Sequence, residues 1–303
     1  MEKDVSESIL KNRSRREYEY RRKNVYYRRL RAIKKIASYI ILTAVAVYAA
    51  FPIYYAVETS LNRIGALVQS SISDLVPVHP TLSNYYQLLF KEPFFLWLKN
   101  TLVLDLAATA IGVALSITSG IAFSRMNVPL KKALLYMLLI LSLFPFTIMV
   151  IPFYFMFAEL RLVGYYSLII PYSAGAVIFS SYLIKNAVDA IPKDFEEAAQ
   201  VDGYTRTAAL FRVLVPMSRP VISFAAVVAF MGPYTDYALA STFITRAKFY
   251  TMAIALYYVS QGTIHINYGI YAAFSVLMGI PIFVLFFVFQ RYFISGFSIA
   301  QYK

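Results

Sequence analysis

Six long apolar runs constrain this chain more than any other feature. Four contain no Lys, Arg, Asp or Glu and are as long as the roughly 20 residues that a helix needs to cross the hydrocarbon core of a bilayer. Two more contain one acid each, Asp105 and Asp236. We therefore expect an all-α, polytopic integral membrane protein with six transmembrane helices, in agreement with a composition that is 59% hydrophobic and 15% charged. The uncharged runs are residues 37–57, 133–157, 162–184 and 266–290, and the runs with an acid are residues 100–124 and 220–245.

A further apolar stretch, residues 249–263, is harder to assign. It is uncharged, but Ser260, Gln261, Gly262 and Thr263 interrupt it. The apolar part is too short to span a bilayer, so we interpret it as a short interfacial or re-entrant segment.

The distribution of basic residues predicts the orientation of the chain. Six spans place both termini on one side of the membrane, and cytoplasmic segments are enriched in Lys and Arg. Of the 29 basic residues, 23 fall in the two tails and in the loops at 125–132 and 185–219, and 6 fall elsewhere. We expect a multi-pass protein of the cell membrane with both termini cytoplasmic. Its predicted parts are a basic N-terminal tail (residues 1–36), a six-span domain (37–290) with a charged cytoplasmic loop (186–219), and a C-terminal tail (291–303).

The N-terminal tail is rich in Arg, Lys and Tyr over residues 11–35. Nucleic-acid binding is one interpretation, because cations contact phosphates and tyrosines stack on bases. A basic, aromatic juxtamembrane segment also binds anionic lipid and enforces topology. We favour this second interpretation, and so predict membrane lipid as a partner and no nucleic acid.

No pattern for catalysis or metal binding is evident. Cysteine is absent, His79 and His265 lie in separate outer segments, and the carboxylates are scattered. No G-x-x-x-x-G-K-[S/T] loop, which would hold phosphates, occurs in the chain. We predict no enzyme activity, no catalytic residue, no metal site and no cofactor in this chain. If it depends on ATP and Mg²⁺, a partner ATPase binds them.

The charged loop contains ten Lys, Arg, Asp and Glu residues between positions 185 and 219. Each would cost roughly 2.5–3.5 kcal/mol at the centre of a bilayer, so the loop must lie in water or against a partner. Its pattern predicts two short helices. The first ends at Gly203, which can adopt a left-handed conformation, and Thr205 can cap the second, which continues through Phe211 towards Pro216.

Four segments resemble the inner-membrane permeases of binding-protein-dependent ABC importers, and within them the carbohydrate class that is similar to the maltose-type MalG subunit. The most specific segment is Glu197-Ala198-Ala199 with Asp202-Gly203 and the later Pro216, which looks like the cytoplasmic EAA loop of the family. The resemblance covers about residues 51–303. Its other segments are Phe51-Pro52 with residues 59–61, Leu75-Val76-Pro77 with residues 81–85 and 97–102, and Pro281 with residues 290–293 and Gly296.

The resemblance implies a type I ABC importer transmembrane domain that forms half of a sugar pathway, for a di- or oligosaccharide such as maltose, maltodextrin or trehalose. The implied partners are a second, MalF-like permease, two MalK-like ATPase subunits and an extracytoplasmic sugar-binding protein. The small alanines would let the EAA helix seat against the ATPase, and the glutamate would meet a cation there. The implied ATPase-coupling residues are Glu197, Ala198, Ala199, Asp202, Gly203 and Pro216.

Asp236 is the candidate for a contact with the substrate. It follows Gly232-Pro233, a pair that can break a helix and free carbonyl groups to line a cavity. With Tyr234 and Tyr237 it would suit a sugar, whose hydroxyls take hydrogen bonds and whose apolar faces stack on aromatic rings. The alternative is an acid that only orders the helix bundle. Asp105 has a weaker claim, because it lies five residues inside its run and can reach the outer interface.

Two other functions stay open on the sequence alone. One is the same importer for another solute, such as an amino acid, a polyamine or a phosphorus compound. The other is an ion-coupled secondary transporter that works as a single chain. Transport without an ATPase would distinguish the second from an ABC importer.

Overall fold

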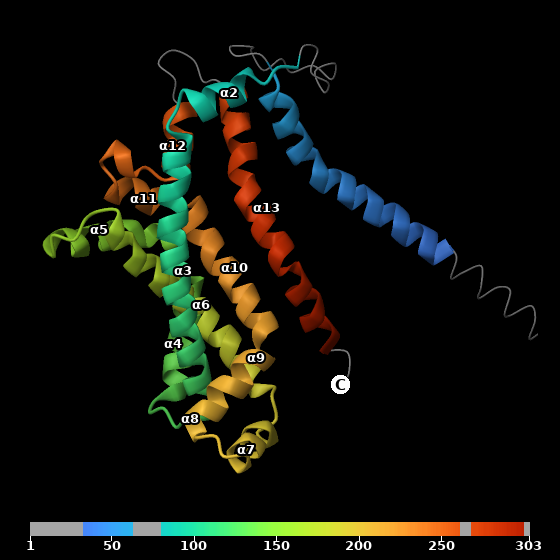
Figure 1. The fold of residues 1–303 in the computed structure, drawn as a ribbon, viewed down its shortest axis with the longest axis vertical. Helices are drawn as coiled ribbons and strands as arrows, with labels where there is room; N and C mark the ends of the chain where they lie inside the picture. Colours follow the sequence, from blue (N-terminus) through green and yellow to red (C-terminus); the bar gives the residue numbers. More distant parts are fainter. Residues whose placement is uncertain (1–32, 63–79, 261–267, 300–303) are drawn as a thin grey trace, which may run out of the picture. The chain divides into compact units, whose positions relative to one another are not determined.

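The computed structural model describes residues 33–62, 80–260 and 268–299, with side chains up to Arg291. The regular elements in these ranges are all helices, which confirms the all-α class for this part of the chain. The chain divides into two units, residues 1–57 and 58–303, and each is considered on its own (Figure 1).

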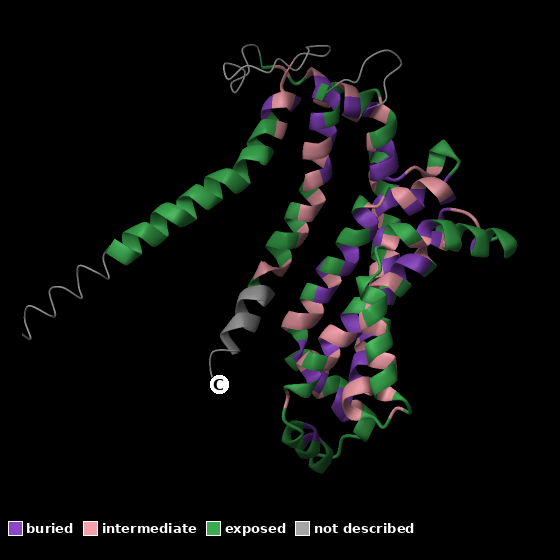
Figure 2. Cartoon of the chain, turned by 180° about the vertical axis from the view of Figure 1, so that it is seen from behind, coloured by how far each residue is buried: buried purple, intermediate pink, exposed green. Residues whose placement is uncertain are grey.

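Helix Ile33–Ser60 provides the described part of the first unit and ends within the second. Figure 2 shows it as exposed along nearly its whole length in the first unit, although its side chains are mostly apolar. An apolar helix of this length is typical of a membrane span, whose side chains face lipid. The predicted first span is confirmed as a helix.

After the last residues of helix Ile33–Ser60, the next described helix of the second unit is the short α2. The unit has two long helices, α3 and α13, with shorter pieces between them. Its elements are α2 (Ser83–Phe90), α3 (Phe94–Arg125), α4 (Lys131–Leu143), η2 (Phe146–Met149), α5 (Val150–Glu159), η3 (Tyr166–Leu168), α6 (Ile169–Asp189), α7 (Asp194–Val201), α8 (Arg206–Ala209), η4 (Leu210–Leu214), α9 (Val215–Met217), α10 (Arg219–Thr235), α11 (Ala238–Phe243), η5 (Ala247–Phe249), α12 (Met252–Ser260) and α13 (Tyr268–Ile299).

Within the described ranges, four helices are long and apolar enough to cross a membrane, and two bent helix pairs raise the number to six if each pair is one span. The predicted number of six therefore depends on how the bent pairs are counted. The four helices are Ile33–Ser60, Phe94–Arg125, Tyr166–Asp189 and Tyr268–Arg291, and the pairs are Lys131–Leu143 with Phe146–Glu159 and Arg206–Met217 with Arg219–Thr235.

The centre of the second unit is the contact between α3 and α6. Two glycines of α3 let the helices approach closely. A Cβ atom at Gly112 would lie 2.8 Å from Ala176 Cβ, and one at Gly120 would lie 2.9 Å from Ile184 Cγ2. Helix α10 packs against both α3 and α6, and α13 packs against α10.

The run at 133–157 is not the single straight span that hydropathy predicts. Helix α4 ends at Leu143, and the helix that follows is inclined to it by 94°. Phe144 is extended, with ψ of 126°, because a proline disfavours the helical conformation for the residue before it. Pro145 itself has ψ of 124°, which is also outside the helical region. Figure 1 shows α5 running across the direction of α3 as a result.

The run at 220–245 also differs from the prediction. Helix α10 ends at Thr235, two residues after Pro233, and Asp236 is extended with ψ of 117°. Helix α11 then begins as a separate element. The short stretch at 249–263 contains α12, whose nine residues are too few to span a bilayer. The positions from Gln261 to Thr263 lie outside the described residues.

Candidate coupling and substrate sites

The charged loop folds into a helical hairpin, α7 to α9, at the end of the second unit opposite α2 (Figure 1). Gly203 makes the turn with φ of 91°, which confirms the predicted left-handed residue. Thr205 caps α8 through the Ala208 N–H, at 3.3 Å. The second helix continues to Met217 but contains the π-helical segment η4. Pro216 follows this segment, and because it has no N–H it cannot continue the α-helical hydrogen bonds.

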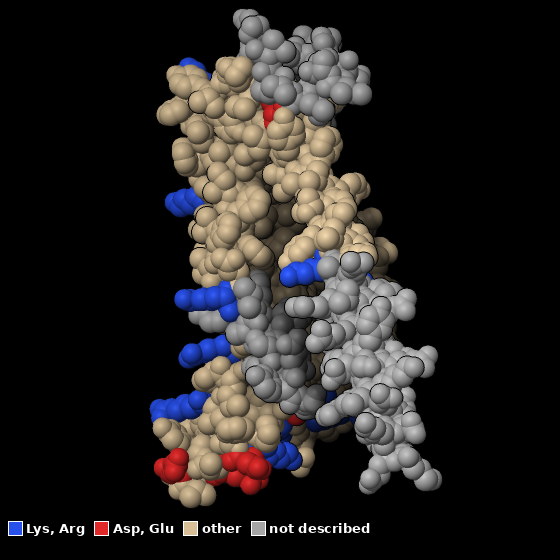
Figure 3. Space-filling model, turned by 90° about the vertical axis from the view of Figure 1, so that its right-hand side faces the viewer, with Lys and Arg blue, Asp and Glu red and all other residues tan. Residues whose placement is uncertain are grey.

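Helix α7 has two distinct faces. Glu197 and Ala198 are exposed, as are Phe195 and Val201, the latter at 88%. Glu196 and Ala199 are buried against the rest of the chain. Figure 3 shows acidic side chains gathered at the end of the molecule where α7 lies. Ala199 thus seats α7 against its own chain, whereas Ala198 lies on the free face, so the two alanines of the motif differ in surroundings.

Arg125 holds the inward face of α7, a contact that the sequence analysis missed. The last residue of α3, it forms an ion pair through Nε with Glu196 Oε1. Its Nη2 donates to the Ile191 carbonyl oxygen at 2.6 Å, and its Nη1 donates to Ser124 Oγ at 3.2 Å. The only signal in the sequence is the i, i+3 spacing of Glu196 and Ala199, which places both residues on one helix face.

Asp236 is half-buried and lies two residues before α11, which begins at Ala238. Its Oδ2 accepts hydrogen bonds from the backbone N–H groups of Leu239 and Ala240, both at 3.1 Å, and from the Tyr172 hydroxyl at 2.7 Å. The carboxylate therefore caps α11 and ties it to α6. All three bonds use Oδ2, so Oδ1 has no hydrogen bond among the described residues.

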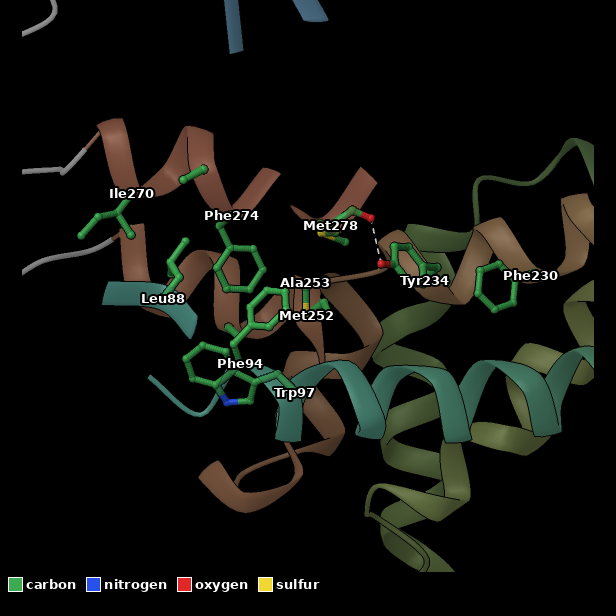
Figure 4. Close-up of a cluster of buried hydrophobic side chains, with 12 residues drawn as sticks. Leu88, Phe94, Trp97, Phe230, Tyr234, Met252, Ala253, Ile270, Phe274 and Met278 are labelled. Carbon is green, nitrogen blue, oxygen red and sulfur yellow. Dashed lines mark hydrogen bonds between the residues drawn. The ribbon is translucent and has the colours of Figure 1, made fainter. Parts of the chain in front are cut away.

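The two tyrosines beside Asp236 have opposite environments. Tyr234 is fully buried in an apolar cluster with Phe274, and its hydroxyl donates to the Met278 carbonyl oxygen at 2.8 Å (Figure 4). Tyr237 is exposed, and its ring centroid lies 4.8 Å from that of Tyr257. Of the pair, only Tyr237 is exposed.

The place of Asp105 in the apolar run suggested that it lies near the end of its helix, but it does not. Because α3 begins at Phe94, Asp105 is its twelfth residue, about 16 Å along the helix axis. Its side chain is fully buried, and neither carboxyl oxygen has a hydrogen-bond partner among the described residues. The expectation that Asp105 reaches the outer interface is therefore wrong.

Two further polar residues of α3 anchor the segment before α12. Asn100 donates from Nδ2 to the carbonyl oxygens of Lys248 and Tyr250, both at 3.0 Å. Thr101 Oγ1 accepts a hydrogen bond from the Met252 N–H at 2.8 Å. These contacts join positions about 150 residues apart, so local sequence patterns do not reveal them.

Comparison with known proteins identifies the family. Residues 112–299 match the binding-protein-dependent transport system inner membrane component. The chain belongs to this permease family. The resemblance inferred from the EAA-like loop is thereby confirmed.

Relatives and a solved structure extend the match over most of the permease. The galactooligosaccharides transport system permease protein GanQ of Bacillus subtilis is 30% identical over 278 residues, which cover 90% of this chain and 97% of that protein. The maltose/maltodextrin transport system permease protein MalG of Salmonella typhimurium is 33% identical over 220 residues, covering 70% and 73%. A chain of a bacterial ABC transporter involved in the import of the acidic polysaccharide alginate shares the fold, with a TM-score of 0.71, 20% identity and coverage of 86% and 96%.

Family membership defines the general role of the chain. The permease is a multi-pass inner-membrane subunit of a binding-protein-dependent ABC importer, and permeases of this family are neither catalytic nor dependent on a cofactor. ABC importer permeases assemble with an ATPase and a binding protein. In the part of the permease that the structure describes, no group of three or more His, Cys, Asp or Glu side chains could hold a metal.

Proposed function

We propose that this permease imports an oligosaccharide that an extracytoplasmic binding protein delivers. It forms half of the pathway beside a second, MalF-like permease, and two MalK-like ATPase subunits drive the cycle. The observation that carries the substrate class is the similarity of this chain to a permease named for galactooligosaccharides, which covers 97% of that permease. The match to a permease named for maltose and maltodextrin supports the same class.

The free face of α7 is our proposed contact with the ATPase. Glu197 is an exposed carboxylate beside the small Ala198, and Phe195 and Val201 add exposed apolar surface. An apolar patch with one charge at its edge suits a protein partner that offers a hydrophobic groove and a cation. Asp202 and Gly203 form the exposed turn, and Pro216 lies on the second helix of the hairpin.

The proposed orientation follows from charge. The hairpin belongs to the tails and loops that together hold 23 of the 29 basic residues, so we place it with both termini in the cytoplasm. The parts of the permease are then a basic tail (residues 1–36), the six-span permease domain (37–290) with the coupling loop (186–219), and a C-terminal tail (291–303).

For the substrate pathway we propose Asp236 and Tyr237. Asp236 Oδ1 is free of hydrogen bonds among the described residues and could accept one from a sugar hydroxyl. The exposed pair of Tyr237 and Tyr257 offers aromatic faces for a sugar ring. Tyr234 belongs to the packed core and would hold the end of α10 in place beside this site.

Reconstituted transport tests this proposal. The complex in proteoliposomes, with its binding protein, should take up an oligosaccharide and not an amino acid, polyamine or phosphorus compound. Uptake of one of those solutes instead would overturn the substrate class. Uptake by the permease alone, driven by an ion gradient, would contradict the importer mechanism as a whole.

Matched variants separate a pathway role of Asp236 from a structural one. Asp236→Asn keeps an oxygen that can cap α11 but removes the charge, whereas Tyr172→Phe removes only the bond to α6. We expect Asp236→Asn to lower uptake about tenfold or more, with normal assembly and basal ATP hydrolysis, and Tyr172→Phe to retain most uptake. Equal losses of uptake and of assembled complex in Asp236→Asn would instead favour the purely structural role.

A further inference from the structure

We propose that Arg125 and Glu196 are positioning residues that link the coupling helix α7 to α3, a membrane helix that the hairpin does not join in sequence. Through this pair, a displacement of α7 reaches α3 directly. The proposal rests on the proposed role of α7 as the ATPase contact. It assigns different roles to two adjacent glutamates, Glu197 towards the partner and Glu196 towards the permease's own bundle.

The contact is buried and uses several donors. The Arg125 and Glu196 side chains retain 7% and 10% of their accessible surface. Besides the ion pair, the same guanidinium bonds the Ile191 carbonyl oxygen just before α7. An arginine with several acceptors holds a fixed geometry, because its donors are arranged in a rigid plane. The base of α7 therefore cannot shift without moving the end of α3.

The end of α3 is in turn tied to α6. Ser124 Oγ donates to Asp189 Oδ1 at 2.5 Å. Lys185 also forms a 2.6 Å ion pair with this carboxylate, but that pair lies within α6 and does not link the two helices. Further along the two helices, Ser119 and Ser181 share a 2.7 Å hydrogen bond. With the close glycine contacts between these helices, α3, α6 and α7 form one mechanical unit.

Helix α3 connects the α3–α6–α7 assembly to the opposite end of the second unit. It has 32 residues and is about 48 Å long. Near its other end, Asn100 and Thr101 hold the segment that leads into α12. A movement that enters α3 at Arg125 can therefore reach the opposite end of the second unit, where it would alter the surroundings of the solute.

The burial of the pair excludes the simpler assignment that both glutamates contact the ATPase. Glu197 is exposed, whereas Glu196 is 8% exposed and already paired. Loss of Glu196 should thus leave the docking face intact and affect the transmission of movement. Loss of Glu197 should affect docking itself.

The experiment compares Glu196→Gln and Arg125→Lys with two controls in the full reconstituted complex. Lys185→Gln removes another ion pair at the same end of the bundle, and Glu197→Gln alters the free face. The readouts are the amount of ATPase that copurifies and the number of ATP molecules hydrolysed per solute transported. We expect Glu196→Gln and Arg125→Lys to retain the ATPase while this number rises about 2- to 30-fold, as is typical of residues that transmit coupling. Lys185→Gln should stay near the wild-type ratio, and the exchange Arg125→Glu with Glu196→Arg should recover part of the loss.

A distance measurement keeps the test independent of transport and of the identity of the solute. The chain has no native cysteine, so spin labels at Lys193→Cys and Met126→Cys, two exposed positions, report the separation of α7 from the end of α3. We expect the same narrow distance in the nucleotide-free and ATP-bound complex, and a broader distribution when Glu196→Gln is added. A wild-type distance that changes with ATP, or a Glu196→Gln complex with unchanged distance and coupling ratio, would overturn the proposal. Failure to transport an oligosaccharide would refute only the substrate class.

Discussion

A methyl group added at Gly112 should force α3 and α6 apart, whereas one added at Gly175 should not. At Gly112 the new Cβ atom would lie 2.8 Å from Ala176 Cβ and 3.1 Å from the Ser173 carbonyl oxygen. Carbon atoms pack at about 3.5–4.0 Å, so the helices would have to separate by roughly 0.7–1.2 Å. At Gly175 the nearest atom is Phe146 Cε2 at 3.6 Å, an ordinary contact.

The comparison isolates the packing cost. Both glycines lie inside helices, so each alanine gains about 1 kcal/mol of helix propensity, which cancels between the two variants. Overpacking a close contact costs about 1–3 kcal/mol. We therefore expect Gly112→Ala to be less stable than Gly175→Ala by about 1–3 kcal/mol.

Thermal unfolding of the purified complex provides the measurement, with transport recorded in parallel. For a domain of this size, each kcal/mol lowers the unfolding midpoint by about 2–4 °C. Gly112→Leu should lower it further, because a larger side chain meets the same backbone. Equal midpoints for Gly112→Ala and Gly175→Ala would show that the α3–α6 contact is looser than the structure indicates, and would weaken the case for a single α3–α6–α7 unit.

Three further predictions concern the coupling hairpin. Glu197→Lys should release the ATPase or abolish substrate-stimulated hydrolysis while the spans still insert, because a lost charge contact at an interface costs about 2–5 kcal/mol. Copurification of the ATPase checks this prediction. A variant that retains the ATPase and couples hydrolysis to transport as the wild type does would refute it. At Gly203, whose φ is 91° with open space around it, alanine should cost about 1–2 kcal/mol of backbone strain. Proline should cost more, because it cannot adopt positive φ. The ratio of transport to ATP hydrolysis should fall in that order, and equal effects of the two substitutions would contradict the prediction. In sealed cells, an impermeant thiol reagent should label Tyr86→Cys and not Asp202→Cys, both exposed positions; labelling at position 202 from outside would reverse the proposed topology.

Local chemistry explains which parts of the fold could be predicted. Apolar runs predict helices because a bilayer leaves backbone groups no other partners. Gly203 and Thr205 were predicted because turn and cap preferences depend on neighbouring residues only. The break at Pro145 was missed because hydropathy does not register that proline redirects the chain within an apolar run.

Long-range packing decides what the sequence leaves open. Asp105 lies well inside α3, which begins six residues before the predicted run and packs against α6, and its side chain is fully buried. Asp236 caps α11 and accepts a hydrogen bond from the hydroxyl of Tyr172, 64 residues earlier. Neither the burial of Asp105 nor the bond between Asp236 and Tyr172 is apparent from nearby residues, so the sequence identified the acids but not their surroundings.

The two glutamates of α7 show most clearly that local sequence does not reveal long-range contacts and that the structure does. Glu196 and Glu197 are chemically identical neighbours, and helix geometry turns them about 100° apart. Glu196 meets Arg125, 71 residues earlier in the chain, while Glu197 stays exposed. A docking contact must be free before the partner binds, and a transmitting contact must be fixed within its own chain. Of these two glutamates, only Glu197 satisfies the first condition and only Glu196 the second, which is why we propose docking for Glu197 and transmission for Glu196.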